Sequence, residues 1–210
     1  MTPFYEQNGI TIYHGDCRQV LPFLPQFDLL LTDPPYGMEY QSNYRKQKHR
    51  KIQNDSQLPL SEIYLALSKA DVAAYVFCRW DNLPQMPVPK SVIAWVKNNW
   101  SMGDLDHEYG RQWEACCFYA RKNHRFTKRP ADVLQFPRTK NENHPTEKPV
   151  SLLTEIISHN RVQTVFDPFV GSGTTLVAAK RAGLQAVGIE LEEAHCDRAV
   201  SRLEQGFLKF

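Results

Sequence analysis

Four residues at the end of one apolar run have the chemical groups needed to hold an amine for reaction. Asp33, Pro34, Pro35 and Tyr36 directly follow the apolar run Phe27–Thr32. A carboxylate and the Pro34 carbonyl can accept from both N–H bonds of an exocyclic amine, which directs its lone pair at an electrophile. The prolines fix φ and remove backbone donors, and Tyr36 offers a face for stacking a flipped base. The same residues can form an ordinary polar turn, but their place at a strand end favours catalysis.

A glycine turn far downstream has the pattern of a nucleoside-binding loop. The sequence predicts a strand at Thr164–Phe166, a tight turn at Asp167–Gly173 and a helix at Thr174–Ala182. This strand–turn–helix unit binds nucleotides in α/β folds. Glu190 follows at the distance where an acid typically binds ribose hydroxyls. A Gly-x-Gly turn alone is often only a tight turn, but the helix and the acid favour a nucleoside ligand.

The rest of the chain must supply a scaffold that positions both motifs, and it alternates short apolar runs with helical patterns. This alternation predicts an α/β fold with a mostly parallel twisted sheet and helices on both faces. Strands are expected at Ile10–Tyr13, Asp28–Thr32, Ala73–Cys78, Val92–Val96, Glu114–Tyr119, Thr164–Phe166 and Ala186–Ile189. Helices are expected at Cys17–Leu24, Leu60–Ala70, Pro149–His159, Thr174–Ala182 and Glu192–Gln205.

Size and composition indicate one globular domain over residues 1–210, in a chain whose hydrophobic content is 42%. No apolar run approaches the ~20 residues that a membrane helix requires. The five cysteines show no Cys-x-x-Cys spacing, so neither a disulfide framework nor a zinc site is expected. We therefore expect a cytoplasmic protein without a metal.

The net charge of +2 conceals two clusters of basic residues. The first cluster consists of Arg45, Lys46, Lys48, Arg50 and Lys51. The second includes Arg125, Lys128 and Arg129, preceded by Arg121 and Lys122. For either run alone, a solvated surface loop and a phosphate-binding surface are equally good interpretations. Two such runs in long irregular segments favour contact with nucleic-acid phosphates. The first run lies in 37–59, which we expect to be a flexible loop.

Together these residues resemble the amino-methylating DNA methyltransferases that use S-adenosylmethionine. The resemblance is carried by Gly15–Cys17, Asp33–Tyr36, Val92–Lys97, Trp113–Lys122, His144–Pro149 and Asp167–Thr175. The catalytic motif precedes the cofactor motif, which is the beta-type order. The resemblance implies a Rossmann-like methyltransferase fold with permuted motifs. It also implies a short target-recognition segment at 122–143.

The resemblance also implies roles for residues at the cofactor. Asp16 is expected to contact the adenine, and Lys148 to pair with the carboxylate of the methionine end. Asp167 is expected to accept from the amino group of the cofactor. The full set of implied cofactor-binding residues is Asp16, His144, Thr146, Lys148, Asp167, Pro168, Phe169, Gly171, Gly173, Thr174, Thr175 and Glu190. No metal is implied, because methyl transfer from a sulfonium needs no Lewis acid.

The function predicted from the sequence is methylation of the N6 amine of adenine in DNA. Aspartate at position 33 resembles the N6-adenine enzymes, since N4-cytosine enzymes of this type more often have serine there. Methylation of N4-cytosine, methylation of an RNA base and a catalytically silent binding subunit stay open as alternatives. DNA is the expected partner, and the resemblance further implies a homodimer and a cognate restriction endonuclease.

Overall fold

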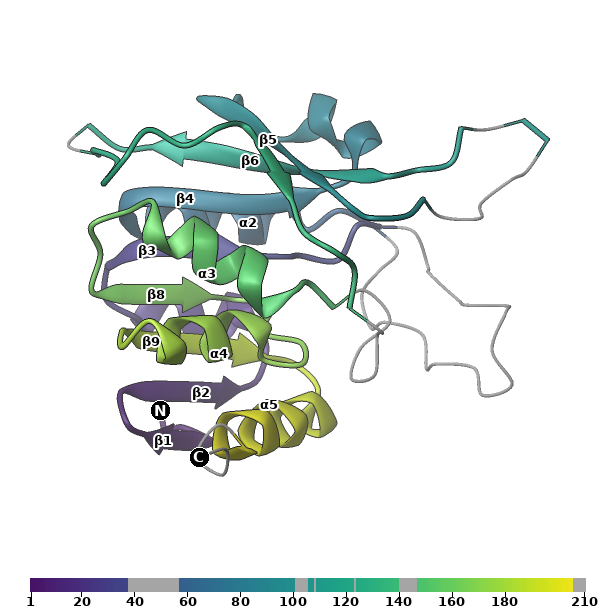
Figure 1. Cartoon of the computed structure of the whole chain (residues 1–210). Coiled ribbons are helices and arrows are strands. Elements are labelled where there is room, and N and C mark those ends of the chain that lie inside the picture. The colour runs from purple at the N-terminus through teal and green to yellow at the C-terminus, as the bar shows by residue number, and fades with distance from the viewer. Residues whose placement is uncertain (38–56, 101–105, 108, 123, 140–146, 206–210) are drawn as a thin grey trace.

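The computed structural model describes residues 1–37, 57–100, 106–107, 109–122, 124–139 and 147–205. Through these residues runs a nine-stranded sheet with the order β1-β2-β9-β8-β3-β4-β6-β5-β7 (Figure 1). The strands are β1 (Tyr5–Gln7), β2 (Ile10–His14), β3 (Phe27–Thr32), β4 (Ala70–Cys78), β5 (Ser91–Val96), β6 (Trp113–Ala120), β7 (Val133–Gln135), β8 (Thr164–Asp167) and β9 (Gln185–Glu190). The α-helices are α1 (Cys17–Val20), α2 (Leu60–Ser68), α3 (Val150–Ser158), α4 (Thr174–Arg181) and α5 (Glu193–Gln205). Two 3₁₀ helices, η1 (Leu21–Phe23) and η2 (Trp80–Gln85), complete the described elements.

The central strands are parallel, as the sequence predicts. β2, β9, β8, β3 and β4 pair in parallel, so their carboxyl ends lie along one edge of the sheet. The exception inside the sheet is β6, which runs antiparallel to both β4 and β5. The amino end of β6 therefore lies beside the carboxyl end of β4, where Ala115 pairs with Cys78. The sequence pattern did not reveal this reversal.

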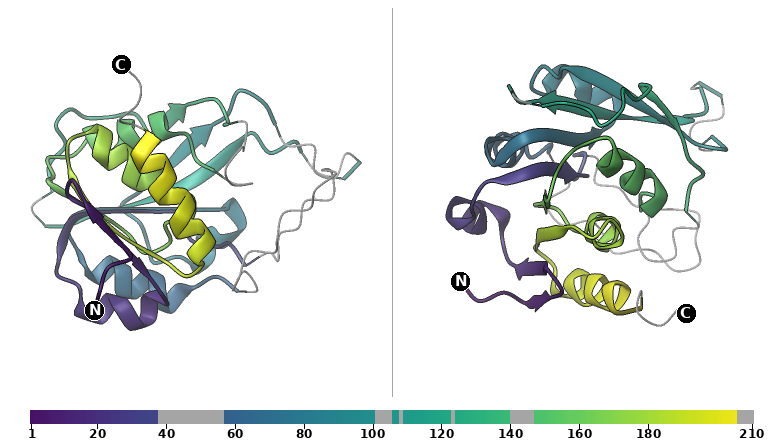
Figure 2. Two further views of the ribbon diagram at one scale, coloured as in Figure 1. Left: turned by 90° about the horizontal axis from the view of Figure 1, so that it is seen from below. Right: turned by 60° about the vertical axis from the view of Figure 1, so that its left-hand side comes forward.

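Helices cover both faces of the sheet and enclose a hydrophobic core on each (Figure 2). On one face Leu152, Ile156 and Leu176 belong to the core formed under α3, α4 and α5. On the other face Leu21 and Ile63 belong to the core under α1, η1 and α2. Burial on both faces explains why strands such as β3 are continuous apolar runs without alternation. The predicted arrangement of helices on both faces is confirmed.

All seven predicted strands are present, with ends shifted by up to three residues. The three-residue edge strands β1 and β7 and the two 3₁₀ helices were not predicted. The predicted helix Cys17–Leu24 is wrong in its second half, where η1 replaces α-helix around Pro22, a residue without an N–H to donate. The predicted helix Leu60–Ala70 ends earlier, because Ala70 begins β4. No helix among the described residues is both long and apolar enough to cross a membrane.

Candidate active site

The Asp-Pro-Pro-Tyr motif and the glycine turn open into one cavity at the carboxyl edge of the sheet. β3 and β8 pair in parallel, with Leu30 opposite Phe166, so the segments that follow them lie side by side. The cavity has a volume of about 790 Å³, within the range of roughly 300–1,000 Å³ typical of small-molecule sites. The sequence placed both motifs at strand ends, and the sheet order brings them together.

Positive φ angles shape the glycine turn. Gly171 has φ +54° and Gly173 has φ +85°, a region that favours glycine. A Cβ on Gly173 would lie 2.7 Å from the Cβ of Ala199, so this glycine lets α5 pack against the turn. Gly171 lines the cavity and a Cβ there would meet nothing within 4 Å. Gly171 thus faces the ligand space, whereas Gly173 holds the turn from behind.

The Glu190 carboxylate fixes the turn from the end of β9. It accepts from the N–H of Gly171 at 2.7 Å and from the N–H of Glu192 at 2.9 Å. Its side chain lines the cavity although the residue is only 8% exposed. Each carboxylate oxygen keeps a further lone pair, which suits the hydroxyl donors of a ribose.

Asp167, at the end of β8, is a buried carboxylate beside the turn. It accepts from the Thr32 hydroxyl at 2.6 Å and from the Phe169 N–H at 3.0 Å. Burial raises the pKa of Asp167 to about 6, against the lowering effect of these hydrogen bonds. On the far side of the turn, Asp16 caps α1 and pairs with Arg18 at 2.5 Å, which lowers the pKa of Asp16.

Arg202 of α5 ties the glycine turn to the segment that precedes α3. Its Nη1 donates to the Ser172 carbonyl at 2.8 Å, to the Ser172 hydroxyl at 2.9 Å and to the Thr174 hydroxyl at 3.0 Å. Its Nη2 pairs with Glu147 at 2.6 Å, and the two side chains are 13% and 6% exposed. Glu147 directly precedes Lys148, so one guanidinium connects both sides of the cavity.

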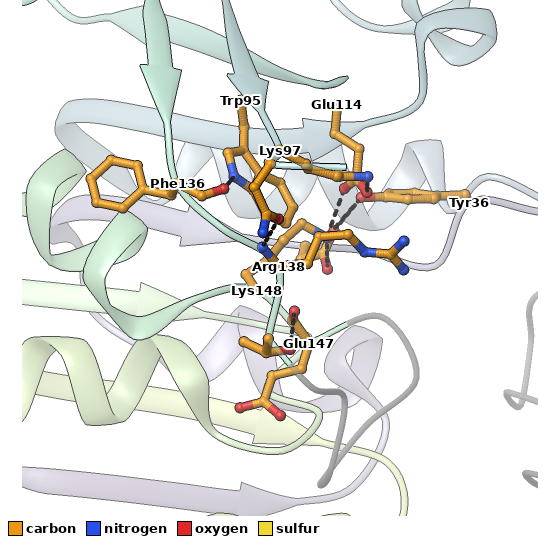
Figure 3. A network of polar contacts seen from close by, with 11 residues as sticks. Tyr36, Trp95, Lys97, Glu114, Phe136, Arg138, Glu147 and Lys148 are labelled. Carbon is orange, nitrogen blue, oxygen red and sulfur yellow. Dashed lines mark hydrogen bonds and ion pairs between the residues drawn. The ribbon is translucent and has the colours of Figure 1, made fainter. Parts of the chain in front are cut away.

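The Lys148 ammonium lies against the Asp-Pro-Pro-Tyr motif (Figure 3). It donates to Asp33 Oδ2 at 2.5 Å and to the Tyr36 hydroxyl at 3.2 Å. The Tyr36 hydroxyl in turn donates to Asp33 Oδ1 at 2.5 Å. Lys148 also lies over the rings of Tyr36 at 5.5 Å and Phe77 at 5.2 Å. Burial alone lowers the pKa of Lys148, but the neighbouring carboxylates outweigh burial and raise it.

Glu114 and Lys97 extend this network, and neither was predicted from the sequence as a site residue. Lys97 donates to Glu114 Oε1, and Lys148 lies 3.2 Å from Glu114 Oε2. Burial alone would raise the pKa of Glu114, but the two ammonium groups lower it to about 2. Glu114 reaches the cavity because β6 is antiparallel, which turns its first residues toward the carboxyl edge. The sequence signal that could have identified them is their position, since each is an ionisable residue at one end of an apolar strand.

The predicted residues that line the cavity come from both motifs and from three other segments. They are Asp16, Asp33, Pro34, Pro35, Tyr36, Lys148, Asp167, Pro168, Phe169, Gly171, Thr174, Thr175 and Glu190. Predictions for Arg45, Lys46, Lys48, Arg50, Lys51, His144 and Thr146 fall outside the described residues. The expected pairing of Lys148 with a cofactor carboxylate stays a prediction, since in this structure Lys148 pairs with carboxylates of the protein.

The second basic run lies away from the cavity. Arg121 follows β6 and its N–H bonds to the Val72 carbonyl at 3.0 Å, at the amino end of β4. The Thr127 N–H bonds to the His159 carbonyl at 2.9 Å, at the same edge. The exposed residues of this run, Arg125, Lys128 and Arg129, are absent from the cavity lining. The reversed direction of β6 carries them to the opposite edge, so the structure does not bring them together with the catalytic motif.

Different basic and aromatic residues surround the cavity. The arginines that line it are Arg18, Arg79, Arg111 and Arg138. Trp80 and Trp113 also line it and are 56% and 44% exposed. Exposed tryptophans beside arginines form a surface suited to bases and phosphates. Sequence clustering missed these arginines because they come from separate parts of the chain.

The cavity fits a ligand that carries positive charge and hydroxyl donors. Asp16, Asp33, Asp167 and Glu190 all line it. Open space at Gly171 admits a ligand close to the backbone. A nucleoside with an ammonium and a sulfonium, as in S-adenosylmethionine, matches this set of acceptors.

Sequence and fold comparisons agree with this geometry. A family model described as DNA methylase, for N6/N4 methyltransferases, matches residues 127–201. The candidate methylase YubD of Escherichia coli K12 is 32% identical, over 90% of this chain and 88% of its own. The DNA adenine methyltransferase YhdJ of the same organism is 27% identical, over 92% of this chain and 82% of its own. The crystal structure of the M1.HpyAVI complex with S-adenosylmethionine superposes with a TM-score of 0.72 at 25% identity, over 92% of this chain and 100% of that chain.

Proposed function

The chain belongs to the N6/N4 family of DNA methyltransferases and uses S-adenosylmethionine, and from this premise we propose that it methylates the N6 amine of adenine in DNA. The observation that carries the proposal is the placement of Asp33 and Tyr36 in the same cavity as the glycine turn. A base held by Asp33 and Tyr36 and a cofactor held by the glycine turn would meet inside a cavity of about 790 Å³. Aspartate at position 33 and the similarity to YhdJ support adenine over cytosine.

The proposed chemistry needs an amine whose lone pair points at an electrophilic methyl group. S-adenosylmethionine, when bound, supplies that methyl group on a sulfonium. Asp33 accepts a hydrogen bond from one N–H of the target amine, and the Pro34 carbonyl accepts one from the other N–H. Tyr36 stacks on the base. Because these groups mainly orient and polarise, alignment and electrostatics provide most of the rate enhancement. The proton released from the methylated amine leaves through the carboxylate of Asp33.

The cofactor contacts are proposed on the opposite wall of the cavity. Glu190 accepts from the ribose hydroxyls and Asp16 from the adenine amine, while Phe169 packs on the adenine. Asp167 accepts from the ammonium of the methionine end, and Gly171 allows close approach of the backbone. Gly173, which packs against α5, acts by shaping the turn.

The proposed DNA surface is the rim of the cavity. Arg79, Arg111 and Arg138 contact phosphates, while Trp80 and Trp113 contact bases next to the target. That 37–59 is a flexible loop and that 122–143 recognises the target stay predictions. The segment 122–143 contains β7 and the buried Leu134. A homodimer and a partner endonuclease are further predictions of the family resemblance.

The test uses purified protein, methyl-labelled S-adenosylmethionine and, in separate reactions, unmethylated duplex DNA and RNA. The product is digested to nucleosides, and the methylated nucleoside is identified by mass. N6-methyladenine supports the proposal, N4-methylcytosine overturns the base assignment, and label in RNA alone overturns the substrate. Asp33→Ala should abolish transfer while binding S-adenosylmethionine, whereas Asp71→Ala, at the amino edge of the sheet, should transfer normally. Full transfer by Asp33→Ala would refute the proposed catalytic role.

A further inference from the structure

Four charged side chains of alternating sign line up from the target-amine site into the protein. Asp33, Lys148, Glu114 and Lys97 form this charge chain. Figure 3 labels its last three members. Lys148 bridges its two acidic members, at 2.5 Å from Asp33 and 3.2 Å from Glu114. Lys97 pairs with Glu114 from the other side. The four come from separate segments, so only the fold brings them together.

The charge chain competes with the proposed substrate. Asp33 Oδ2 accepts from Lys148 and Asp33 Oδ1 accepts from Tyr36, so both oxygens that would hold a target amine have partners. Lys148 places a primary amine beside the Asp33 carboxylate and over the Tyr36 ring, at 5.5 Å from its centroid. This is the position proposed for the amine of the base. Because the Lys148 ammonium and the amine of the base would occupy the same space, Lys148 must move off Asp33 before the base is held there.

A lysine that leaves Asp33 needs another counter-charge, because its side chain is only 3% exposed. An ammonium buried without a partner is strongly unfavourable. Glu114 Oε2 is buried and already lies 3.2 Å from the Lys148 ammonium, so a second carboxylate stands next to Asp33 within reach of the same lysine. A small movement of Lys148 away from Asp33 would therefore keep its ammonium paired, with Glu114 as the main counter-charge.

We propose that Glu114 is a positioning residue that receives the Lys148 ammonium when the target amine takes its place on Asp33. This inference rests on the proposed function, because it assumes that an amine binds Asp33. Lys97 holds Glu114 in place through the other oxygen, Oε1. Glu114 acts through Lys148 and does not itself touch the base or the cofactor.

The role of charge can be separated from the role of shape by two substitutions of Glu114. Glu114→Gln keeps the shape and loses the charge, whereas Glu114→Asp keeps the charge and loses one methylene. If Glu114 only fills space, the glutamine variant is the more active. If it balances Lys148, the aspartate variant is the more active. Glu155→Gln, a surface change on α3 outside the cavity lining, is the matched control.

The experiment measures kcat/KM for DNA methylation in wild type, both Glu114 variants, Lys148→Met and the Lys148→Met/Glu114→Gln double variant. We expect Glu114→Gln to lower kcat/KM by about 10- to 100-fold, the size of one hydrogen bond to a charged group. Glu114→Asp should lose less. In the Lys148→Met background the glutamine substitution should cost less than about threefold, because no ammonium remains to be received.

Two outcomes would overturn the inference in an active enzyme. One is a glutamine variant at least as active as the aspartate variant. The other is an equal loss from Glu114→Gln with and without Lys148. Absence of transfer by the wild type would instead refute the proposed function. Because the wild type and Glu155→Gln are measured in the same assay, the two failures are distinguishable.

Discussion

Replacing Arg202 with methionine should separate the stability of the fold from the shape of the cofactor turn. The Arg202–Glu147 pair is almost fully buried, at 13% and 6% exposure of the side chains. Removing the guanidinium breaks a buried ion pair, and breaking such a pair costs about 3–5 kcal/mol. It also removes the donors to the Ser172 carbonyl and the Thr174 hydroxyl. Methionine keeps most of the apolar stem volume of arginine.

The loss of stability converts into a shift of the melting temperature. Unfolding entropy of ~2.1 cal/mol/K per residue gives about 0.44 kcal/mol/K for 210 residues. A loss of about 3–5 kcal/mol therefore lowers Tm by roughly 7–11 °C. Adding Glu147→Gln removes the buried negative charge as well, so the double variant should be more stable than Arg202→Met alone. Its affinity for S-adenosylmethionine should stay roughly tenfold weaker than wild type, because the turn still lacks its donor.

Thermal unfolding without cofactor and calorimetric binding of S-adenosylmethionine measure the two effects separately. The four proteins of the cycle are wild type, Arg202→Met, Glu147→Gln and the double variant. Additive losses of stability would show that the buried pair is not coupled, and would refute the reasoning. Unchanged cofactor affinity in Arg202→Met would refute the role of Arg202 in shaping the turn.

Three further predictions follow from the geometry. Asp167 has a pKa of about 6 when folded, above its unfolded value, so the protein loses stability as pH rises and Asp167 ionises. Asp167→Asn should therefore lose less stability than wild type between pH 4 and pH 7. Denaturant titrations should show a difference of up to about 3 kcal/mol. Gly173→Ala should lower Tm far more than Gly171→Ala, because both have positive φ but only the first meets α5; equal shifts in melting scans would contradict this. Arg138→Ala should weaken DNA binding and reduce the salt slope by about 1, whereas Arg129→Ala should change neither in fluorescence anisotropy titrations.

The sequence was sufficient to predict the parallel part of the sheet and the motifs at its carboxyl edge. Strands β3 and β8 contain consecutive buried apolar residues and are followed or ended by chemically distinctive residues, so strand type and ligand edge follow from local pattern. The glycine turn was predicted for a similar reason, since the conformations of Gly171 and Gly173 are local properties. Both features could be predicted because they are determined by residues adjacent to one another in the sequence.

The direction of β6 could not be predicted, and two site assignments depended on it. An apolar run such as Ala115–Tyr119 looks the same in either direction, because side-chain burial does not depend on strand polarity. Once β6 is antiparallel, Glu114 moves into the cavity and Arg125 moves to the opposite edge. The partners of Lys148 were likewise not predictable, since they come from three separate parts of the chain.

The two edges of the sheet limit how copies of this protein can associate. β1 and β7 are three residues long each, so either edge presents only a short ladder of backbone donors and acceptors. Short edge strands disfavour the addition of a strand from another chain, the route by which sheets merge into larger sheets and aggregates. A homodimer, which the family resemblance implies, is therefore expected to form through side chains of helices or loops. Its stability should accordingly respond to surface substitutions there and be insensitive to changes in the edge strands.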